Sequence, residues 1–346
     1  MSEINFDPVT LTQSLVKCAS VTPKDEGALT VVENHLSAIG CDCHPLTFSG
    51  NNSYEVKNLF ATIGNEGKHF AYAGHTDVVP VGNESSWKYP PFSGKIDEGK
   101  LYGRGSEDMK SSVACFISAA KRFVDKYKNI PGKISFIITG DEERDSVNGT
   151  PRILEWASKQ NYKFDHCLVG EPTSKNEVGD KVKIGRRGSV SFFFQVKGIQ
   201  GHTANSHLAE NSSHHLVNLL NSILEEPLDE GNENFLPTSV QIATIDIGNP
   251  VQNVIPELAK ATVNIRFNDM HSSDSLIKWI DNKIEKIFSK LENASCTYTY
   301  DATAESFLNK AGDLYNIISK SISDVTGRNS PPEQATDGGT SDARYI

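Results

Sequence analysis

The sequence predicts an α/β protein: a doubly wound domain that carries an inserted, ferredoxin-like α+β domain. Up to residue 171, short apolar runs alternate with segments of helical periodicity, which is the element order of a doubly wound sheet. From about residue 181 to residue 300, the expected order becomes βαββαβ, as in ferredoxin-like folds. A chain of 346 residues is also long for one core, so we expect two domains, 1–180 with 295–346 and 181–294.

Apolar runs bounded by turn residues predict the strands of the first domain. Residues 133–139 are nearly continuously apolar, as expected for a strand that is covered on both faces. Further strands are expected at 58–63, 69–75, 94–97, 100–102 and 166–169.

Helical spacing of apolar residues predicts the helices of the same domain. Leu29, Val32 and Leu36 recur at helical spacing in a segment that Gly40 closes. A second apolar stripe runs from Val113 to Tyr127. Helices are therefore expected in the first part of 7–40, at 28–39, after residue 108 and at 151–159.

The inserted domain is expected to contain two helices and four strands. The strands are predicted at 189–196, 239–247, 260–267 and 295–300, and the helices at 213–225 and 273–290. The chain then returns through a helix at 311–326 and a loop at 331–342.

Composition excludes several classes of protein. A net charge of -10 argues against nucleic acid or an anionic membrane as partner. No uninterrupted apolar run approaches membrane-spanning length, and residues 1–7 contain no signal-like segment, so we expect a cytoplasmic protein. The six cysteines lack zinc-knuckle spacing and are expected to be free thiols.

Acidic residues gather where the predicted strands end, which is where α/β sheets bind ligands. His75 and Asp77 lie two apart on an extended segment, so their side chains can face one place. One histidine with several carboxylates suits Zn²⁺ or a related divalent ion. The set comprises His75, Asp77, Asp108, Glu142, Glu143 and Glu171. The alternative is that these acids are solvated loop residues, with Asp108 as a helix N-cap.

Three further segments carry candidate chemistry. Adjacent side chains point apart, so Glu142 and Glu143 are expected to divide into one metal ligand and one general base. Cations and a hydroxyl at 185–189 suggest anion binding, although charged residues also protect exposed sheet edges. His202 follows a glycine and could donate to a developing oxyanion, or be an ordinary surface histidine.

With these motifs in hand, the chain resembles the dinuclear-zinc superfamily of aminoacylases, acetylornithine deacetylases and glutamate carboxypeptidases. The likeness covers essentially the whole chain and rests on segments 74–80, 103–110, 140–143, 170–172 and 201–202. Segments 185–189, 253–256 and 338–342 favour the branch that hydrolyses N-succinyl-LL-2,6-diaminopimelate to succinate and LL-2,6-diaminopimelate, in lysine biosynthesis.

The resemblance implies a zinc-hydrolase catalytic domain that binds two Zn²⁺ or Co²⁺ ions per subunit. His75, Asp108, Glu143 and Glu171 would bind metal, with Asp108 bridging both ions. Asp77 would orient His75, and Glu142 would be the general base. The peptide between Asp108 and Met109 is expected to be cis.

The resemblance also assigns roles to the inserted domain, which would dimerise and act as a lid. His202 would reach the active site of the partner subunit, so a homodimer is expected. The substrate is expected to be a small dicarboxylate amide, whose carboxylates would be held by Arg186, Ser189, Asn253, Arg266 and Thr340.

Two departures from the family pattern limit these expectations. The family usually has valine and an aromatic-proline pair after Gly-His, whereas residues 203–206 are Thr-Ala-Asn-Ser. In the family, the second zinc is bound by a histidine that follows shortly after the segment matching 339–342, and this sequence has no histidine after His271. A C-terminally truncated member with an incomplete second site and weak or absent activity is therefore expected. The alternatives are an N-acetylornithine deacetylase or aminoacylase, and an inactive homologue that only binds and dimerises.

Overall fold

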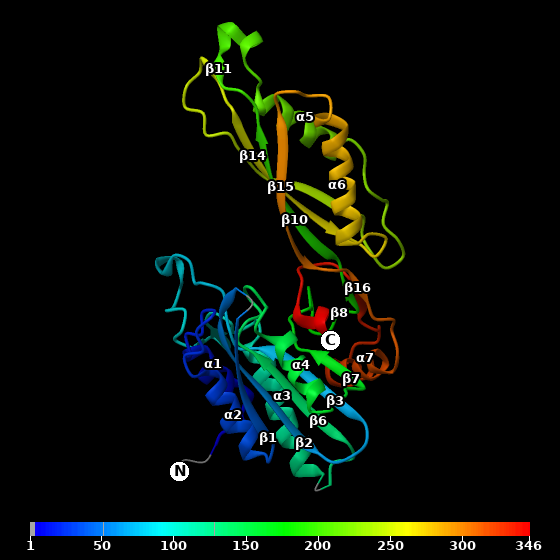
Figure 1. Ribbon diagram of the computed structural model, residues 1–346. Helices are drawn as coiled ribbons and strands as arrows, with labels where there is room; N and C mark the ends of the chain where they lie inside the picture. Colours follow the sequence, from blue (N-terminus) through cyan, green and yellow to red (C-terminus); the bar gives the residue numbers. More distant parts are fainter. Residues whose placement is uncertain (1–3, 51, 128) are drawn as a thin grey trace. The chain divides into compact units, whose positions relative to one another are not determined.

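The computed structural model describes residues 4–50, 52–127 and 129–346. The chain divides into two compact units, Met1–Pro172 with Ser341–Ile346 and Thr173–Thr340 (Figure 1). No helix in the described part of the chain is both long and apolar enough to cross a membrane.

The first unit is built on a five-stranded mixed sheet in the order β1-β2-β6-β3-β7. Strand β3 lies parallel to its neighbours β6 and β7, whereas β2 lies antiparallel to its neighbours β1 and β6. The strands are β1 Asp42–Gly50, β2 Ser53–Gly64, β3 His69–His75, β6 Lys133–Thr139 and β7 His166–Val169, with a small hairpin of β4 Lys95–Asp97 and β5 Lys100–Tyr102. The strands predicted at 58–63, 69–75, 133–139 and 166–169 are confirmed, whereas β1 was not predicted.

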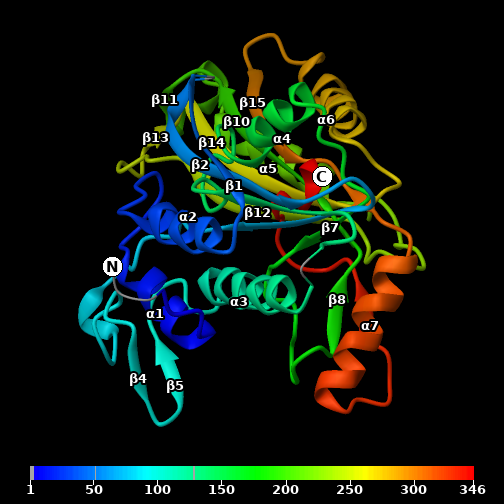
Figure 2. The same ribbon diagram turned by 90° about the horizontal axis from the view of Figure 1, so that it is seen from below.

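Helices cover both faces of this sheet, as Figure 2 shows. Along β6, Phe136 and Ile138 pack in the core that includes α1, α2 and α3, while Ile137 packs on the opposite face with Ile153 of α4. The helices are α1 Pro8–Lys17, α2 Ala28–Ala38, α3 Lys110–Lys126 and α4 Thr150–Lys159. Burial on both faces explains why β6 is nearly continuously apolar.

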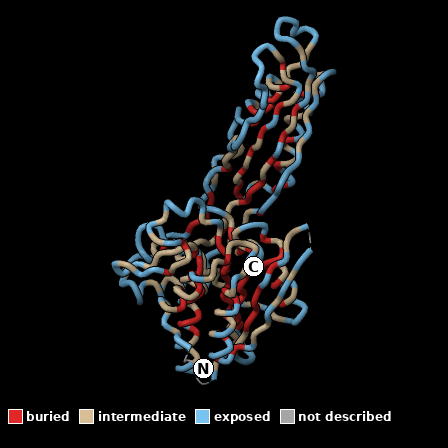
Figure 3. Tube along the Cα trace, turned by 90° about the vertical axis from the view of Figure 1, so that its left-hand side faces the viewer, coloured by how far each residue is buried: buried red, intermediate tan, exposed pale blue. Residues whose placement is uncertain are grey.

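The second unit contains a four-stranded antiparallel sheet in the order β12-β14-β10-β15. Along β10, Val190, Phe192 and Phe194 are buried in the core with helices α5 and α6, whereas Phe193 is exposed. Figure 3 shows buried positions, in red, along the strands of this unit. The elements are β10 Gly188–Lys197, α5 Ser212–Leu224, β12 Ser239–Asp246, β14 Leu258–Phe267, α6 Ser273–Phe288 and β15 Ser295–Ala304. This order matches the predicted βαββαβ pattern.

Short elements complete the two units. In the second unit, β8 Lys181–Lys183 pairs with β17 Glu333–Ala335, β9 Gly185–Arg186 with β16 Phe307–Leu308, and β11 Gly201–His202 with β13 Val254–Ile255. The remaining helices are α7 Asp313–Thr326 and the 3-10 turns η1 Glu84–Ser86, η2 Thr203–Leu208 and η3 Asp342–Tyr345.

The compact units differ from the predicted domains at their borders. Strand β15 pairs along β10, so residues 295–304 belong to the sheet of the second unit and not to the first domain. Strands β16 and β17 also pair within the second unit. The predicted βαββαβ order includes β15 as its fourth strand, so a border at residue 294 separates this strand from the sheet that it completes, whereas the short pairings of β16 and β17 have no signature in the local sequence. The roles of the domains in catalysis and dimerisation stay predictions.

Candidate metal centre

His75 ends strand β3 and points its free ring nitrogen at a group of carboxylates. Its side chain is 1% exposed, and its Nδ1 lies 2.9 Å from the backbone oxygen of Asp77. Its Nε2 lies 3.1 Å from Oδ1 of Asp108, 3.8 Å from Oε1 of Glu171 and 4.0 Å from Oε2 of Glu142. A partner on Nδ1 leaves Nε2 available as a ligand atom, which is the usual arrangement of a metal-binding histidine.

Asp77 connects three segments that are distant in sequence. Its carboxylate accepts hydrogen bonds from the hydroxyl of Thr22 at 2.7 Å and from the backbone N–H groups of Glu142 and Glu143 at 3.2 and 3.1 Å. It also lies 3.5 Å from Nδ1 of His75. Burial acts to raise the pKa of the Asp77 carboxyl, but His75, the Thr22 hydroxyl and the backbone N–H of Glu142 together lower this pKa. Asp77 is therefore a fixed anion that positions both the histidine and the acidic loop.

Asp108 precedes α3 without capping it. The N-cap position belongs to Met109, which makes no side-chain capping bond, and the peptide between the two residues is cis as expected. The Asp108 side chain is half-exposed, and its hydrogen bond with His75 lowers the pKa of its carboxyl. The capping alternative for Asp108 is therefore wrong, because this carboxylate is directed at the histidine instead.

The loop after β6 holds Glu142 and Glu143 through the preceding residue. Asp141 is fully buried and accepts hydrogen bonds from the Tyr54 hydroxyl and from the backbone N–H groups of Val147 and Asn148. These bonds fold the segment 141–148 back on itself. No local pattern pointed to Tyr54 or Thr22, since each contacts a residue that is distant in the sequence.

The two adjacent glutamates differ in their surroundings. Burial raises the pKa of Glu142 to about 8, with further increases from the nearby carboxylates of Asp342, Glu171 and Glu143. Burial also raises the pKa of Glu143. A carboxylate whose pKa lies near neutrality is suited to take up and release a proton.

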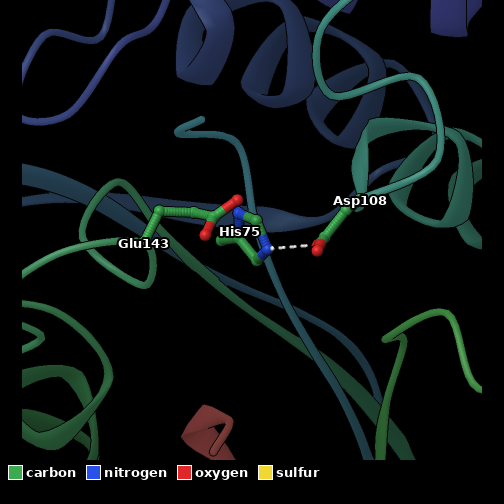
Figure 4. A group of neighbouring side chains, drawn as sticks. All are labelled: His75, Asp108 and Glu143. Atoms are coloured by element: carbon green, nitrogen blue, oxygen red, sulfur yellow. Dashed lines mark hydrogen bonds and ion pairs between the residues drawn. The ribbon is translucent and has the colours of Figure 1, made fainter. Parts of the chain in front are cut away.

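The carboxylates form two overlapping ligand groups around His75. One group is His75, Asp108 and Glu143, drawn in Figure 4, and the other is His75, Glu142 and Glu171. In each, one ligand atom per residue lies within 4.8 Å of the others. One imidazole with several carboxylates is a donor set that fits Zn²⁺ or a related divalent ion.

The protonation of His75 supports the same conclusion. Burial acts to lower its pKa, but hydrogen bonds with Asp108 and Asp77 raise the pKa well above its usual value. The surrounding acids therefore favour a positive charge at this place, which a proton or a metal ion can supply.

Glu171 reaches the cluster because a glycine precedes it. A Cβ atom on Gly170 would lie 2.2 Å from the hydroxyl oxygen of Tyr72 and 2.4 Å from that of Ser112. No larger residue fits there without a shift of its neighbours. Strand β7 can therefore end directly against β3 and bring Glu171 beside His75.

The predicted substrate residues fall into separate places in the second unit. Nη1 of Arg186 donates to the backbone oxygen of Gly339, next to Thr340. Ser189 lies opposite Arg266 in the β10–β14 pair. Asn253 Nδ2 lies 3.4 Å from Nε2 of His202. The structure thus groups Arg186 with Thr340, Ser189 with Arg266, and His202 with Asn253.

The chain is similar to known proteins over nearly its whole length. Residues 71–346 match the model of Peptidase family M20/M25/M40. Succinyl-diaminopimelate desuccinylase of Parvibaculum lavamentivorans is 44% identical over 341 residues, which cover 99% of this chain and 85% of the relative. The enzyme of that name from Ehrlichia canis is 45% identical, with coverage of 99% and 87%.

A solved structure shows the same fold at low sequence identity. Aminopeptidase PepT from Bacillus cereus superposes with a TM-score of 0.77 at 18% identity, covering 99% of this chain and 87% of the other. This likeness concerns the fold alone, which combines α/β elements in the arrangement described above.

Proposed function

Because the chain belongs to peptidase family M20/M25/M40, we propose that it is a metal-dependent hydrolase that cleaves N-succinyl-LL-2,6-diaminopimelate to succinate and LL-2,6-diaminopimelate. The observation that carries the proposal is the buried His75 surrounded by carboxylates, in a chain 43–45% identical to proteins named for this reaction.

His75, Asp108, Glu143 and Glu171 would hold the metal, which the family uses as a pair of ions. A bound Zn²⁺ or Co²⁺ ion would polarise the scissile carbonyl and make water a stronger nucleophile. The completeness of a second site stays a prediction, which zinc titration tests by counting tightly bound ions.

The protein's own side chains would manage the protons and the geometry. Glu142 would take a proton from the attacking water and deliver it to the nitrogen of the leaving amine, a role that its place beside His75 among the ligand carboxylates supports. Asp77 would keep His75 and the backbone of the acidic loop in place. Holding these groups fixed reduces the reorganisation that the reaction requires.

Residues of the second unit would recognise the substrate. Arg186, Ser189, Asn253, Arg266 and Thr340 supply guanidinium, amide and hydroxyl groups that suit carboxylates. His202 would donate a hydrogen bond to the developing oxyanion, in the active site of a partner subunit. A homodimer is part of this proposal, supported by the exposed apolar side chain of Ile245 on the sheet-edge strand β12. The proposal also places the protein in the cytoplasm.

A substrate comparison tests the proposal. The zinc-loaded protein is assayed with N-succinyl-LL-2,6-diaminopimelate and with N-acetylornithine at equal concentrations. We expect the succinyl amide to be hydrolysed with the larger kcat/KM. A preference for N-acetylornithine would refute the assignment, and hydrolysis of neither compound would favour a homologue that only binds.

A further inference from the structure

One cation of the motif at 185–189 has no part in the proposed function. Arg187 follows β9, while Arg186 donates to the loop at Gly339. Nη1 of Arg187 donates to the backbone oxygen of Pro237 at 3.3 Å, and its Nε is buried without a hydrogen-bond partner. Its guanidinium group is therefore held in place by a single neutral contact.

The sheet register places Arg187 beside Arg266. Strand β14 lies between β10 and β12, and Arg266 is opposite Ser189 on one side and Ser239 on the other. Arg187 precedes Ser189 by two residues, and Pro237 precedes Ser239 by two residues. The hydrogen bond from Arg187 to the backbone oxygen of Pro237 spans β14 from one side to the other. The Arg187 side chain therefore crosses the end of β14 next to Arg266.

Asn264 fixes the orientation of Arg266. Its Oδ1 accepts a hydrogen bond from Nε of Arg266 at 3.1 Å, and its Nδ2 donates to the Ser191 hydroxyl at 2.9 Å and lies 3.4 Å from that of Ser189. The bond to Nε occupies the inner edge of the guanidinium group. Its two terminal nitrogens make the fork that matches a carboxylate.

The electrostatics of this place favour an anion. Burial and the neighbouring charge of Arg187 lower the pKa of Arg266. Some other cations of the unit have acidic partners: Lys183 is paired with Asp337, and Arg328 with Glu177. Among the described residues, the ion pairs include none for Arg187 or Arg266. Two half-buried guanidinium groups side by side are stabilised when a carboxylate lies between them.

We propose that Arg187 and Arg266 form one carboxylate subsite, with Asn264 as the residue that positions Arg266. This deepens the proposed function, on which it rests, because it adds a second guanidinium group to the recognition of a substrate carboxylate. The competing explanation is that Arg187 only protects an irregular strand end from association.

Arg187→Met tests the subsite, because methionine keeps much of the side-chain length and removes the charge. We expect KM for the succinyl substrate to rise about tenfold or more, as for loss of a charge-assisted hydrogen bond, while kcat changes less than about twofold. Arg187→Lys keeps the charge but not the fork and should give a smaller increase. Lys260→Met is the matched control, since Lys260 is an exposed cation on β14, the strand that also carries Arg266.

Carboxamide analogues identify the carboxylate. In each analogue one substrate carboxylate is replaced, and its effect on KM is measured in wild type and in Arg187→Met. For the analogue that lacks the carboxylate bound here, Arg187→Met should add little, whereas the effects should multiply for the others. Effects that multiply for every analogue would overturn the subsite.

Binding of succinate by calorimetry needs no hydrolysis and separates the two proposals. If wild type hydrolyses the substrate and Arg187→Met has the same KM and the same succinate affinity as wild type, the subsite alone is refuted. Wild type that neither hydrolyses the substrate nor binds succinate would overturn both. A melting curve confirms that each variant is folded, and Asn264→Ala should raise KM with Arg266 unchanged.

Discussion

At the scale of single residues, the site depends on Asp77 as much as on the ligands themselves. Its carboxylate contacts a hydroxyl from the α1–α2 connection, two backbone N–H groups of the acidic loop and the ring of His75. Partners of this kind set the orientation and basicity of metal ligands. A change in one of them should therefore weaken metal binding without removing any ligand.

Thr22→Val tests this dependence. Valine has almost the same shape as threonine but cannot donate to Asp77, so we expect zinc affinity to fall about tenfold, as for other partners of ligand residues. Zinc competition with a chromophoric chelator measures the change. Thr297→Val, at an exposed position of β15, is the control. Equal zinc affinity in wild type and Thr22→Val would show that this hydroxyl is dispensable.

Lys110 gives a prediction about pH. It is fully buried, its Nζ donates to the backbone oxygen of Cys18, and burial lowers its pKa to about 8. The unfolded chain, in which lysine has a pKa of about 10.4, therefore binds more protons than the folded chain between about pH 8 and pH 10. The free energy of unfolding should rise with pH across this window because of Lys110.

Lys110→Met should lack that rise. The difference in unfolding free energy between wild type and variant should shift by about 2 kcal/mol in favour of wild type from pH 8 to pH 10. Urea unfolding at several pH values measures it, and titrations common to both proteins cancel in the difference. A difference that is constant with pH would contradict the lowered pKa.

At the scale of elements, the conformation of the segment 141–148 depends on a contact with a distant strand. Tyr54 on β2 holds the buried Asp141 through one hydroxyl. Tyr54→Phe leaves that carboxylate with one partner fewer and should destabilise the protein by about 1–3 kcal/mol while reducing kcat. Tyr298→Phe is the control, because its hydroxyl bonds the exposed Asp281. Unchanged kcat in Tyr54→Phe would show that the loop is held by its other contacts.

Local patterns predicted most elements and the carboxylates at their ends. The apolar run of β6, the helical stripe of α3 and the His75 strand end are all visible within short windows of sequence. The contacts that could not be predicted join distant segments: Thr22 with Asp77, and Tyr54 with Asp141. Such contacts depend on how the whole chain packs, so they cannot be predicted from the periodicity of a short segment.

At the scale of the whole molecule, the proposed homodimer would use the edge of the second unit's sheet. Ile245 on the edge strand β12 is 53% exposed. An exposed apolar edge strand is suited to pairing with a second copy. Ile245→Lys should therefore shift the protein from dimer to monomer, and Thr297→Lys on the opposite edge strand should not. Analytical ultracentrifugation distinguishes these states, and a monomeric wild type would refute the dimer.

The most direct measurement of the central claim is amide hydrolysis as a function of metal. Chelator-treated protein is assayed with N-succinyl-LL-2,6-diaminopimelate before and after zinc is added, beside Glu142→Gln and the exposed-helix control Glu155→Gln. We expect zinc to restore turnover in wild type and in Glu155→Gln, while Glu142→Gln binds zinc and loses about 100-fold or more in kcat. Turnover that persists without metal, or that survives in Glu142→Gln, would contradict it.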